Sequence, residues 1–374
     1  MTFSLFLALS RRTPVPRLSP RLFDPITVGG LTVPHRLWVA PMCQYSSVDG
    51  MPGEWHLVHL GSFAIGRAGL IMTEAAAVSP IGRITPDDAG IWNDDHTAGW
   101  RRVVDFVHGM DGLIGIQLSH AGRKASTYPP TRGRGSVPAS EGGWTTVGPS
   151  AVAWGPFTPP VELDREGIAR IVAEFGDAAA RSVEAGFDLV EIHAAHGYLL
   201  GQFLSPTSNL RTDEYGGDVA GRSRIVREVV EAVRARVPSE MPVVLRVSAS
   251  EWVPGGVTVD DTIAALHLIE GVDLVSVSSG GNNPDQAIPS GPGYQQPLSR
   301  AVRAAIDAPV GVAGLITTPE QAEAALGAED TDVVYVARQF LREPTFALRA
   351  AAALGGELAW PWQYNRAKYV ESIP

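Results

Sequence analysis

The segment EIHAAHGY, residues 191–198, places two histidines three positions apart and a tyrosine two positions after the second histidine. It follows the apolar run FDLV at 187–190. Side chains of these types could bind a metal ion, could move protons and stabilise charge on a substrate, or could be two histidines that happen to be neighbours in a core. The elements around the segment must decide between these three interpretations.

A metal site would need a third ligand, and Glu74 or His120 could supply one to a His-x-x-His pair. A metal hydrolase would also place an acidic residue in the motif, as in His-Glu-x-x-His, whereas Ala194 and Ala195 occupy that spacing here. The tyrosine that follows, Tyr198, argues against two merely buried histidines. We therefore predict no metal and favour a proton-handling site.

The chain contains eight short apolar runs rich in Val, Ile and Leu, which are typical of strands that are buried on both faces. Helical patterns separate them, for example over 168–185, 222–237 and 319–326. The predicted strands span 37–42, 69–75, 113–118, 188–193, 242–248, 273–278, 310–315 and 332–337.

Eight such βα units predict a (β/α)8 TIM barrel rather than an open doubly wound sheet. No Gly-x-Gly-x-x-Gly follows a strand, so the Rossmann alternative lacks its main signal. The sequence ITVGGLTV predicts an N-terminal β-hairpin turning at Gly29-Gly30, which could plug the bottom of the barrel. The long segment 127–160, after the third strand, is rich in Gly, Ser, Pro and Trp and is expected to cover an active site.

Composition restricts the class of protein. Hydrophobic residues make up 45% and charged residues 19%, which is enough apolar material for a large core. The formal net charge of −10 argues against binding to nucleic acid or an anionic membrane, and no apolar run is long enough to span a bilayer. The single cysteine, Cys43, excludes an internal disulfide and fits a reducing cytoplasm.

Three regions are expected. Residues 1–20 are interpreted as a disordered or artefactual N-terminal extension, with a signal or targeting peptide as the alternative. Residues 21–356 would form the barrel, and 357–374 would form a C-terminal tail that could contact another subunit.

Polar side chains gather where the chemistry of such a barrel is found, at the carboxyl ends of its strands. A single polar residue at a strand end could simply face solvent at the rim. Barrel interiors are normally filled by Val, Ile and Leu, so a set of polar residues from seven strands indicates a functional site. The set is Cys43, Tyr45, Glu74, Gln117, His120, His193, His196, Tyr198, Arg246, Gly314 and Arg338.

The sequence resembles the old yellow enzyme family of FMN-dependent ene-reductases from about residue 21 to about residue 370. The segments that carry it are APMCQYSS (40–47), EAAAVSPIGRI (74–84), IQLSHAGRKA (116–125), EIHAAHGYLLGQFLSPTSNLRTDEYGG (191–217) and GLITTPEQAE (314–323). APMCQYSS and the tail QYNRA resemble the thermophilic-like subgroup, which includes xenobiotic reductases.

The resemblance implies non-covalent FMN, with NAD(P)H as its reductant. Arg246 would contact the flavin edge that becomes anionic on reduction, and Gln117 would pair with the pyrimidine. Gly314 and Arg338 would hold the phosphate. The family usually has Gly before that arginine, where Ala337 stands here. Further cofactor contacts are expected from Pro41, Met42, Cys43, Ala75, His193 and Ala313.

The same resemblance implies a reaction in which hydride reaches the β-carbon of an activated alkene while charge builds on the substrate carbonyl oxygen. His193 and His196 would donate two N–H groups to that oxygen. Tyr198 would protonate the α-carbon. Tyr45 would contact the substrate, and Cys43 would tune the flavin, although a single buried cysteine is also commonly inert packing.

The tail WPWQYNRAKY, 360–369, has two interpretations. In the resembling subgroup an arginine at the position of Arg366 reaches the active site of a neighbouring subunit, which implies a homodimer or homotetramer. The alternative is a tail folded onto its own barrel.

Three other functions stay open on the sequence alone. They are an FMN barrel enzyme that oxidises a hydroxy acid or amine, a metal-dependent hydrolase, and a flavin-binding protein without catalysis.

Overall fold

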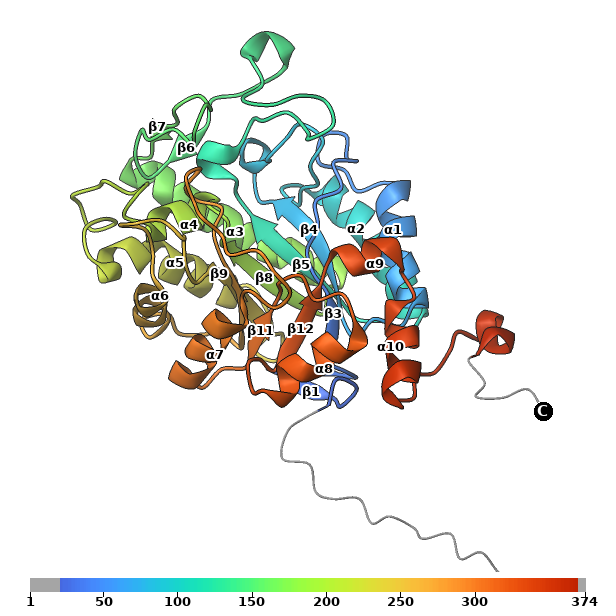
Figure 1. Cartoon of the computed structure of the whole chain (residues 1–374). Helices are drawn as coiled ribbons and strands as arrows, with labels where there is room; N and C mark the ends of the chain where they lie inside the picture. The colour runs from blue at the N-terminus through green and yellow to red at the C-terminus, as the bar shows by residue number, and fades with distance from the viewer. Residues whose placement is uncertain (1–20, 369–374) are drawn as a thin grey trace, which may run out of the picture.

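A closed barrel of eight parallel strands forms the centre of the computed structural model, which describes residues 21–368 (Figure 1). The strand order around the barrel is β10-β11-β12-β3-β4-β5-β8-β9. The predicted (β/α)8 barrel is therefore confirmed. Its strands are β3 (Leu37–Val39), β4 (Ile71–Ala77), β5 (Ile114–Ser119), β8 (Leu189–Ala194), β9 (Val243–Ser248), β10 (Leu274–Ser278), β11 (Val310–Val312) and β12 (Val333–Val336).

All eight predicted strands are present, but two of them end three residues earlier than the apolar runs suggest. β3 stops at Val39 rather than at residue 42, and the chain leaves the barrel as a loop. β11 stops at Val312, because Gly314 has φ of 148° and Leu315 has φ of 54°, which no strand accommodates. In both cases the lost strand residues become part of the loops at the barrel mouth.

Helices follow the strands and surround the barrel (Figure 1). Side-chain caps fix several starts: α3 begins three residues before the predicted position because the Asp164 carboxylate accepts the backbone N–H of Gly167. The helices are α1 (Glu54–Ile65), α2 (Asp94–Gly109), α3 (Arg165–Ala185), α4 (Leu199–Leu204), α5 (Val219–Arg234), α6 (Val259–Leu266), α7 (Gln296–Ala305), α8 (Pro319–Gly327), α9 (Arg338–Arg342) and α10 (Phe346–Leu354).

The N-terminal hairpin is formed by β1 (Ile26–Val28) and β2 (Leu31–Val33), with Gly29 at φ of 54° in the turn. Its apolar residues join the cluster that fills the lower barrel, alongside Leu189, Val244, Leu274 and Val333. The N–H of Gly30 donates to the Glu240 carbonyl just before β9. The hairpin therefore closes the barrel at the end opposite the strand carboxyl termini.

The long segment 127–160 is tied down at several points rather than loose. It contains the short 3-10 helix η3 (Ala139–Glu141) and strand β6 (Val147–Gly148), which pairs with β7 (Val161–Glu162). The indole N–H of Trp144 donates to the carbonyl of Ile81. Figure 1 places this segment beyond the carboxyl ends of the strands.

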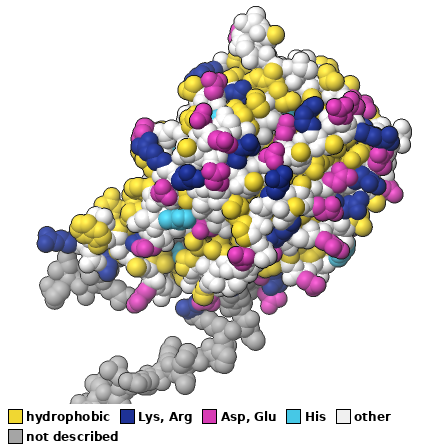
Figure 2. All heavy atoms as spheres, turned by 180° about the vertical axis from the view of Figure 1, so that it is seen from behind, with side chains coloured by type: hydrophobic (Ala, Val, Ile, Leu, Met, Phe, Trp, Pro, Cys, Tyr) yellow, Lys and Arg dark blue, Asp and Glu magenta, His cyan; other side chains and the backbone are white. Residues whose placement is uncertain are grey.

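The C-terminal segment ends in the 3-10 helix η4 (Trp362–Ala367), which extends away from the barrel in Figure 1. The interpretation of residues 1–20 lies outside the described residues. Across residues 21–368, no helix is both long enough and apolar enough to cross a bilayer. On the face shown in Figure 2, Lys and Arg side chains are interspersed with Asp and Glu.

Candidate active site

The end of β8 and the tight turn that follows it carry both histidines and the tyrosine. His193 is inside the strand and 3% exposed, His196 has φ of 57°, and Tyr198 precedes the first residue of α4. Between them Gly197 has φ of 68°, and a Cβ there would lie 2.3 Å from the Cα of Asn282. Only glycine fits this position, because its conformation is left-handed and the loop after β10 lies against it.

Hydrogen bonds link the two imidazoles in a chain. His193 Nδ1 accepts the Ala195 N–H at 3.2 Å, so its proton is assigned to Nε2, which lies 3.3 Å from His196 Nδ1. His196 Nε2 lies 2.7 Å from the Ser278 hydroxyl. The two rings are perpendicular, with centroids 5.1 Å apart. The sequence predicts two N–H groups aimed at one point, whereas in this arrangement the His193 N–H faces His196.

Both imidazoles are neutral at physiological pH. Burial lowers the pKa of each well below the usual histidine value, and the positive charges of Arg246 and Lys124 lower it further. A neutral imidazole has one N–H donor and one acceptor nitrogen, so the partner of one nitrogen decides what the other can do. Ser278 therefore controls which nitrogen of His196 carries the proton.

The Tyr198 ring packs edge-on against His193, with centroids 5.1 Å apart and an interplanar angle of 87°. Burial, together with the neighbouring Cys43 and Tyr45, raises the pKa of the Tyr198 phenol well above its usual value. The hydroxyl is therefore protonated in the free protein.

Lys124 is a site residue that the sequence reasoning missed. Its ammonium donates to the carbonyls of His196 and Gly281, at 2.9 Å each, and lies 5.0 Å from the centroid of the Tyr198 ring. The indole of Trp154 covers it from the long segment, at 4.9 Å. The run GRK was visible in the sequence, but nothing in it indicates that the chain folds Lys124 under the turn after β8.

The loop after β3 brings Pro41, Met42, Cys43 and Tyr45 to the same end of the barrel. Burial and the carboxyls of Asp88 and Glu74 raise the pKa of the Cys43 thiol, so the residue is a thiol rather than a thiolate. Glu74 holds this loop in place: its carboxylate accepts the backbone N–H of Gln44 at 3.0 Å and lies 3.0 Å from His56 Nε2.

The next two strands place Ala75 on β4 opposite Gln117 on β5. The side-chain N–H of Gln117 donates to Glu191 on β8 at 2.5 Å. His120, which the sequence grouped with these residues, is 1% exposed, and its Nδ1 accepts the backbone N–H of Gly122. It is part of the packing around the turn after β5.

A cavity of about 210 Å³ at the ends of β9 to β12 contains five of the predicted cofactor residues. They are Arg246, Ala313, Gly314, Ala337 and Arg338. Within residues 21–368 the buried Nε of Arg246 has no hydrogen-bond partner. A cavity with three arginines, one of them with an unused buried donor, fits an anionic ligand that has planar acceptor groups.

The same cavity is lined by residues that the sequence did not single out. They include Arg342, one helical turn after Arg338, and Gln295, whose side-chain N–H donates to the Ala313 carbonyl oxygen at 2.6 Å. The remaining ones are Ser278, Tyr294, Leu315, Ile316, Thr317, Tyr335 and Gln339. A pair of arginines four residues apart at a helix start was the available signal for Arg342.

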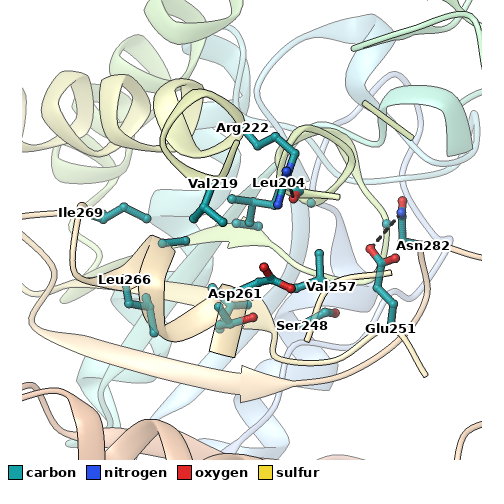
Figure 3. A pocket seen from close by; sticks show the side chains of 16 residues that line it. Leu204, Val219, Arg222, Ser248, Glu251, Val257, Asp261, Leu266, Ile269 and Asn282 are labelled. Carbon is teal, nitrogen blue, oxygen red and sulfur yellow. Dashed lines mark hydrogen bonds between the residues drawn. The ribbon is translucent and has the colours of Figure 1, made fainter. Parts of the chain in front are cut away.

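A second, smaller cavity of about 30 Å³ lies behind the turn, between β9 and helices α4 to α6 (Figure 3). Apolar side chains such as Leu204, Val219 and Leu266 line most of it, and the hydrogen-bonded pair Glu251 and Asn282 stands at one side. It has room for about one water molecule and is too small for a substrate.

Arg366 is the predicted site residue that the barrel does not bring to the mouth. It is exposed in η4, which stands apart from the barrel (Figure 1). Among residues 21–368, no three His, Cys, Asp or Glu side chains are grouped so that they could hold a metal ion.

Comparisons with known proteins agree with this arrangement. A family model described as the NADH:flavin oxidoreductase / NADH oxidase family matches residues 21–357. An NADH:flavin oxidoreductase of Gibberella zeae is 44% identical over 91% of this chain and 87% of that protein. The NADPH dehydrogenase of Bacillus subtilis is 41% identical over 93% of this chain and 99% of that protein.

Solved structures agree as well. Morphinone reductase in complex with tetrahydroNAD has a TM-score of 0.74 at 30% identity, over 91% of this chain and 93% of that one. A 2-naphthoyl-CoA reductase complex has a TM-score of 0.81 at 24% identity, over 90% of this chain and 52% of that one, and is alike in fold.

The charge of Lys124 leads to a prediction about stability. Burial and the nearby Arg123 lower the pKa of Lys124 from 10.5 to about 7. Between these two values the unfolded chain binds more protons than the folded one, so this group makes stability rise with pH. We expect the unfolding free energy of the wild type, relative to Lys124→Met, to increase by about 3.5 kcal/mol between about pH 7 and pH 10.

Urea unfolding at several pH values measures this difference. The chain has only one other lysine, Lys368, which is exposed, so Lys368→Met is a matched control and should follow the wild type. If the unfolding free energies of the wild type and Lys124→Met change in parallel with pH, Lys124 stays charged when folded.

Proposed function

The chain belongs to the NADH:flavin oxidoreductase / NADH oxidase family, the old yellow enzymes, and on this premise we propose that it reduces activated C=C bonds. It is an NAD(P)H-dependent flavin oxidoreductase with FMN as its cofactor. The proposed substrates are α,β-unsaturated carbonyls, maleimides and nitroalkenes. A reducing cytoplasm is the proposed location, in keeping with a single cysteine held as a thiol.

The residues present fit FMN. Arg338 and Arg342 would bind the phosphate beside the main chain of Gly314, in the cavity of about 210 Å³. Arg246, with its unused buried N–H, and Gln117 would hold the pyrimidine edge of the ring system. Bound FMN supplies hydride transfer, accepting a hydride from NAD(P)H and giving it to the β-carbon of the alkene.

The histidine pair would hold the substrate carbonyl oxygen. Two N–H groups can point at that oxygen only if His196 carries its proton on Nδ1, which requires the Ser278 hydroxyl to donate to His196 Nε2. The Ser278 oxygen is 2.7 Å from that nitrogen, but its hydroxyl donates to Gln295 Oε1 at 3.3 Å in the free protein, so it would turn from Gln295 to His196 when the substrate binds. Substrate binding would thus replace the contact between His193 and His196 by two bonds to the oxygen, where charge builds up in the transition state.

Tyr198 would complete the reaction by donating its phenolic proton to the α-carbon, and solvent would reprotonate the phenolate. The observation that carries the proposal is that the end of β8 and the turn after it bring two neutral imidazoles and a protonated phenol together. Neutral imidazoles suit a substrate oxygen that gains negative charge during the reaction, whereas charged imidazoliums would suit a ligand that is already an anion when it binds. A phenol with a raised pKa keeps its proton until the carbanionic centre needs it.

Assembly is the last part of the proposal. η4 holds Trp362, which is 82% exposed, and Tyr364, which is 47% exposed, next to Arg366. Aromatic residues and arginine are favoured interface anchors, and here they stand away from the barrel of their own chain (Figure 1). We propose a homodimer or homotetramer in which Arg366 reaches the active site of a neighbouring subunit and contacts substrate beside Tyr45.

We expect Tyr198→Phe to slow alkene reduction at least about 100-fold while leaving flavin reduction by NAD(P)H within a few-fold of wild type. Only the second half of the reaction uses the phenolic proton. Stopped-flow absorbance measures the two halves separately, with cyclohexenone as the oxidant. Tyr128→Phe is the matched control, because Tyr128 is a half-buried tyrosine of the long segment whose hydroxyl donates to Glu141. Equal slowing of both halves would remove Tyr198 from the role of proton donor.

Ser278→Ala should weaken binding of a para-substituted phenol about fivefold, the equivalent of about 1 kcal/mol for a hydrogen bond that fixes the His196 tautomer. Titration of the FMN-loaded protein, followed by flavin absorbance, gives the affinity. Ser279→Ala is the control because Ser279 is also buried and contacts Gln295 but has no contact with His196. The tautomer argument fails if both variants bind the phenol equally well.

Mixing two inactive variants tests Arg366. One chain carries Tyr198→Phe and His196→Ala, and the other carries Arg366→Ala. If Arg366 acts on a neighbouring subunit, random exchange into dimers should restore roughly a quarter of wild-type activity, because half of the dimers are mixed and each holds one complete site. Exchange is verified by mass spectrometry of differently tagged chains. A mixture that stays inactive after verified exchange places Arg366 at its own barrel or at no active site.

A further inference from the structure

A fully buried carboxyl group stands inside the barrel below the predicted flavin site, and neither the histidine pair nor the tyrosine uses it. Glu191 is 0% exposed and lies two residues before His193 on β8, so both side chains point into the barrel. Two residues earlier, Leu189 belongs to the apolar cluster above the hairpin. Glu191 is therefore the first charged group above an apolar layer.

Gln117 connects Glu191 to the predicted flavin site. The two residues are register partners on β5 and β8, and Gln117 Nε2 lies 2.5 Å from Glu191 Oε1. A carboxylate can only accept this bond, so it fixes which end of the amide faces it. The amide oxygen of Gln117 is thereby left free to accept a hydrogen bond from a ligand.

The other polar neighbours of Glu191 favour its ionised form. Burial has the largest effect and raises the pKa of Glu191 above the usual carboxyl value, while the Arg246 guanidinium, the Gln117 amide and the Tyr335 hydroxyl lower it and partly offset the burial. Arg246 is 7% exposed and has no ion pair within 4 Å among residues 21–368. A buried guanidinium cannot lose its proton, so without an anion in the barrel its charge would be uncompensated.

We propose that Glu191 is a positioning residue for FMN. As a carboxylate it orients the Gln117 amide toward the pyrimidine edge and offsets the charge of Arg246. This negative charge lowers the reduction potential of the flavin. The cause is electrostatic. Reduction adds negative charge to the isoalloxazine, which Arg246 favours and Glu191 opposes. The inference rests on FMN as cofactor, but it does not depend on which substrate the enzyme reduces.

The test is the midpoint potential of FMN in Glu191→Gln, measured on the loaded enzyme by equilibration with a reference dye. This substitution keeps the volume and removes the charge. We expect the equilibrium constant for two-electron reduction to rise about tenfold, which corresponds to about 30 mV. Glu251→Gln is the matched control, because Glu251 is also buried, at 2% exposed, but is hydrogen-bonded to Asn282 outside the barrel. The equilibrium constant for FMN reduction in Glu251→Gln should stay within twofold of the wild-type value.

Glu191→Asp separates charge from fit. It keeps the carboxylate but shortens the reach to Gln117, so we expect FMN to bind more weakly. The equilibrium constant for two-electron reduction should stay within twofold of the wild-type value. An unchanged constant in Glu191→Gln overturns the proposal, as does a tenfold rise in Glu191→Asp. If neither protein folds, Glu191 is a structural residue and the proposal is also wrong. No outcome requires an alkene, so a failed ene-reductase assay would leave the result intact.

Discussion

Pairing between β12 and β3 closes the barrel, and the geometry of the site depends on that closure. Val334 is in register with Leu37, and Val336 with Val39, so the last strand in the chain lies beside the first strand of the barrel. The carboxyl ends of all eight strands then form one ring. Residues as distant in sequence as Cys43 and Ala337 consequently stand at the same mouth, although no local signal in the chain connects them.

A change of polarity along the barrel accompanies this closure. The hairpin and the lowest inward residues make an apolar base, and within four residues of β8 the interior passes from Leu189 through Glu191 to His193. Charged and polar groups in such a position are shielded from water, so their protonation states follow from their neighbours. The same burial holds histidines without charge and keeps the Tyr198 phenol and the Cys43 thiol protonated.

The sequence predicts the barrel well because each strand carries its own signal, a short run of Val, Ile and Leu, and the hairpin turn carries Gly29-Gly30. Strand ends are predicted less well, since Val312 is followed by residues that are apolar but have φ values no strand allows. Cofactor residues at strand ends, such as Arg246 and Gly314, could be placed by resemblance and by the barrel rule. Lys124 and Ser278 could not, because their importance comes from contacts with His196 that span 72 and 82 positions of the chain.

The scarcity of lysine has a practical consequence for handling the protein. Of the two lysines, Lys124 lies beneath Trp154 with its ammonium bound to two carbonyls, whereas Lys368 is exposed two residues after Arg366. Amine-directed reagents, whether dyes, cross-linkers or immobilisation resins, will therefore react in the described part of the chain at the tail. A fluorophore or surface attached in this way sits beside η4 and leaves the barrel itself unmodified.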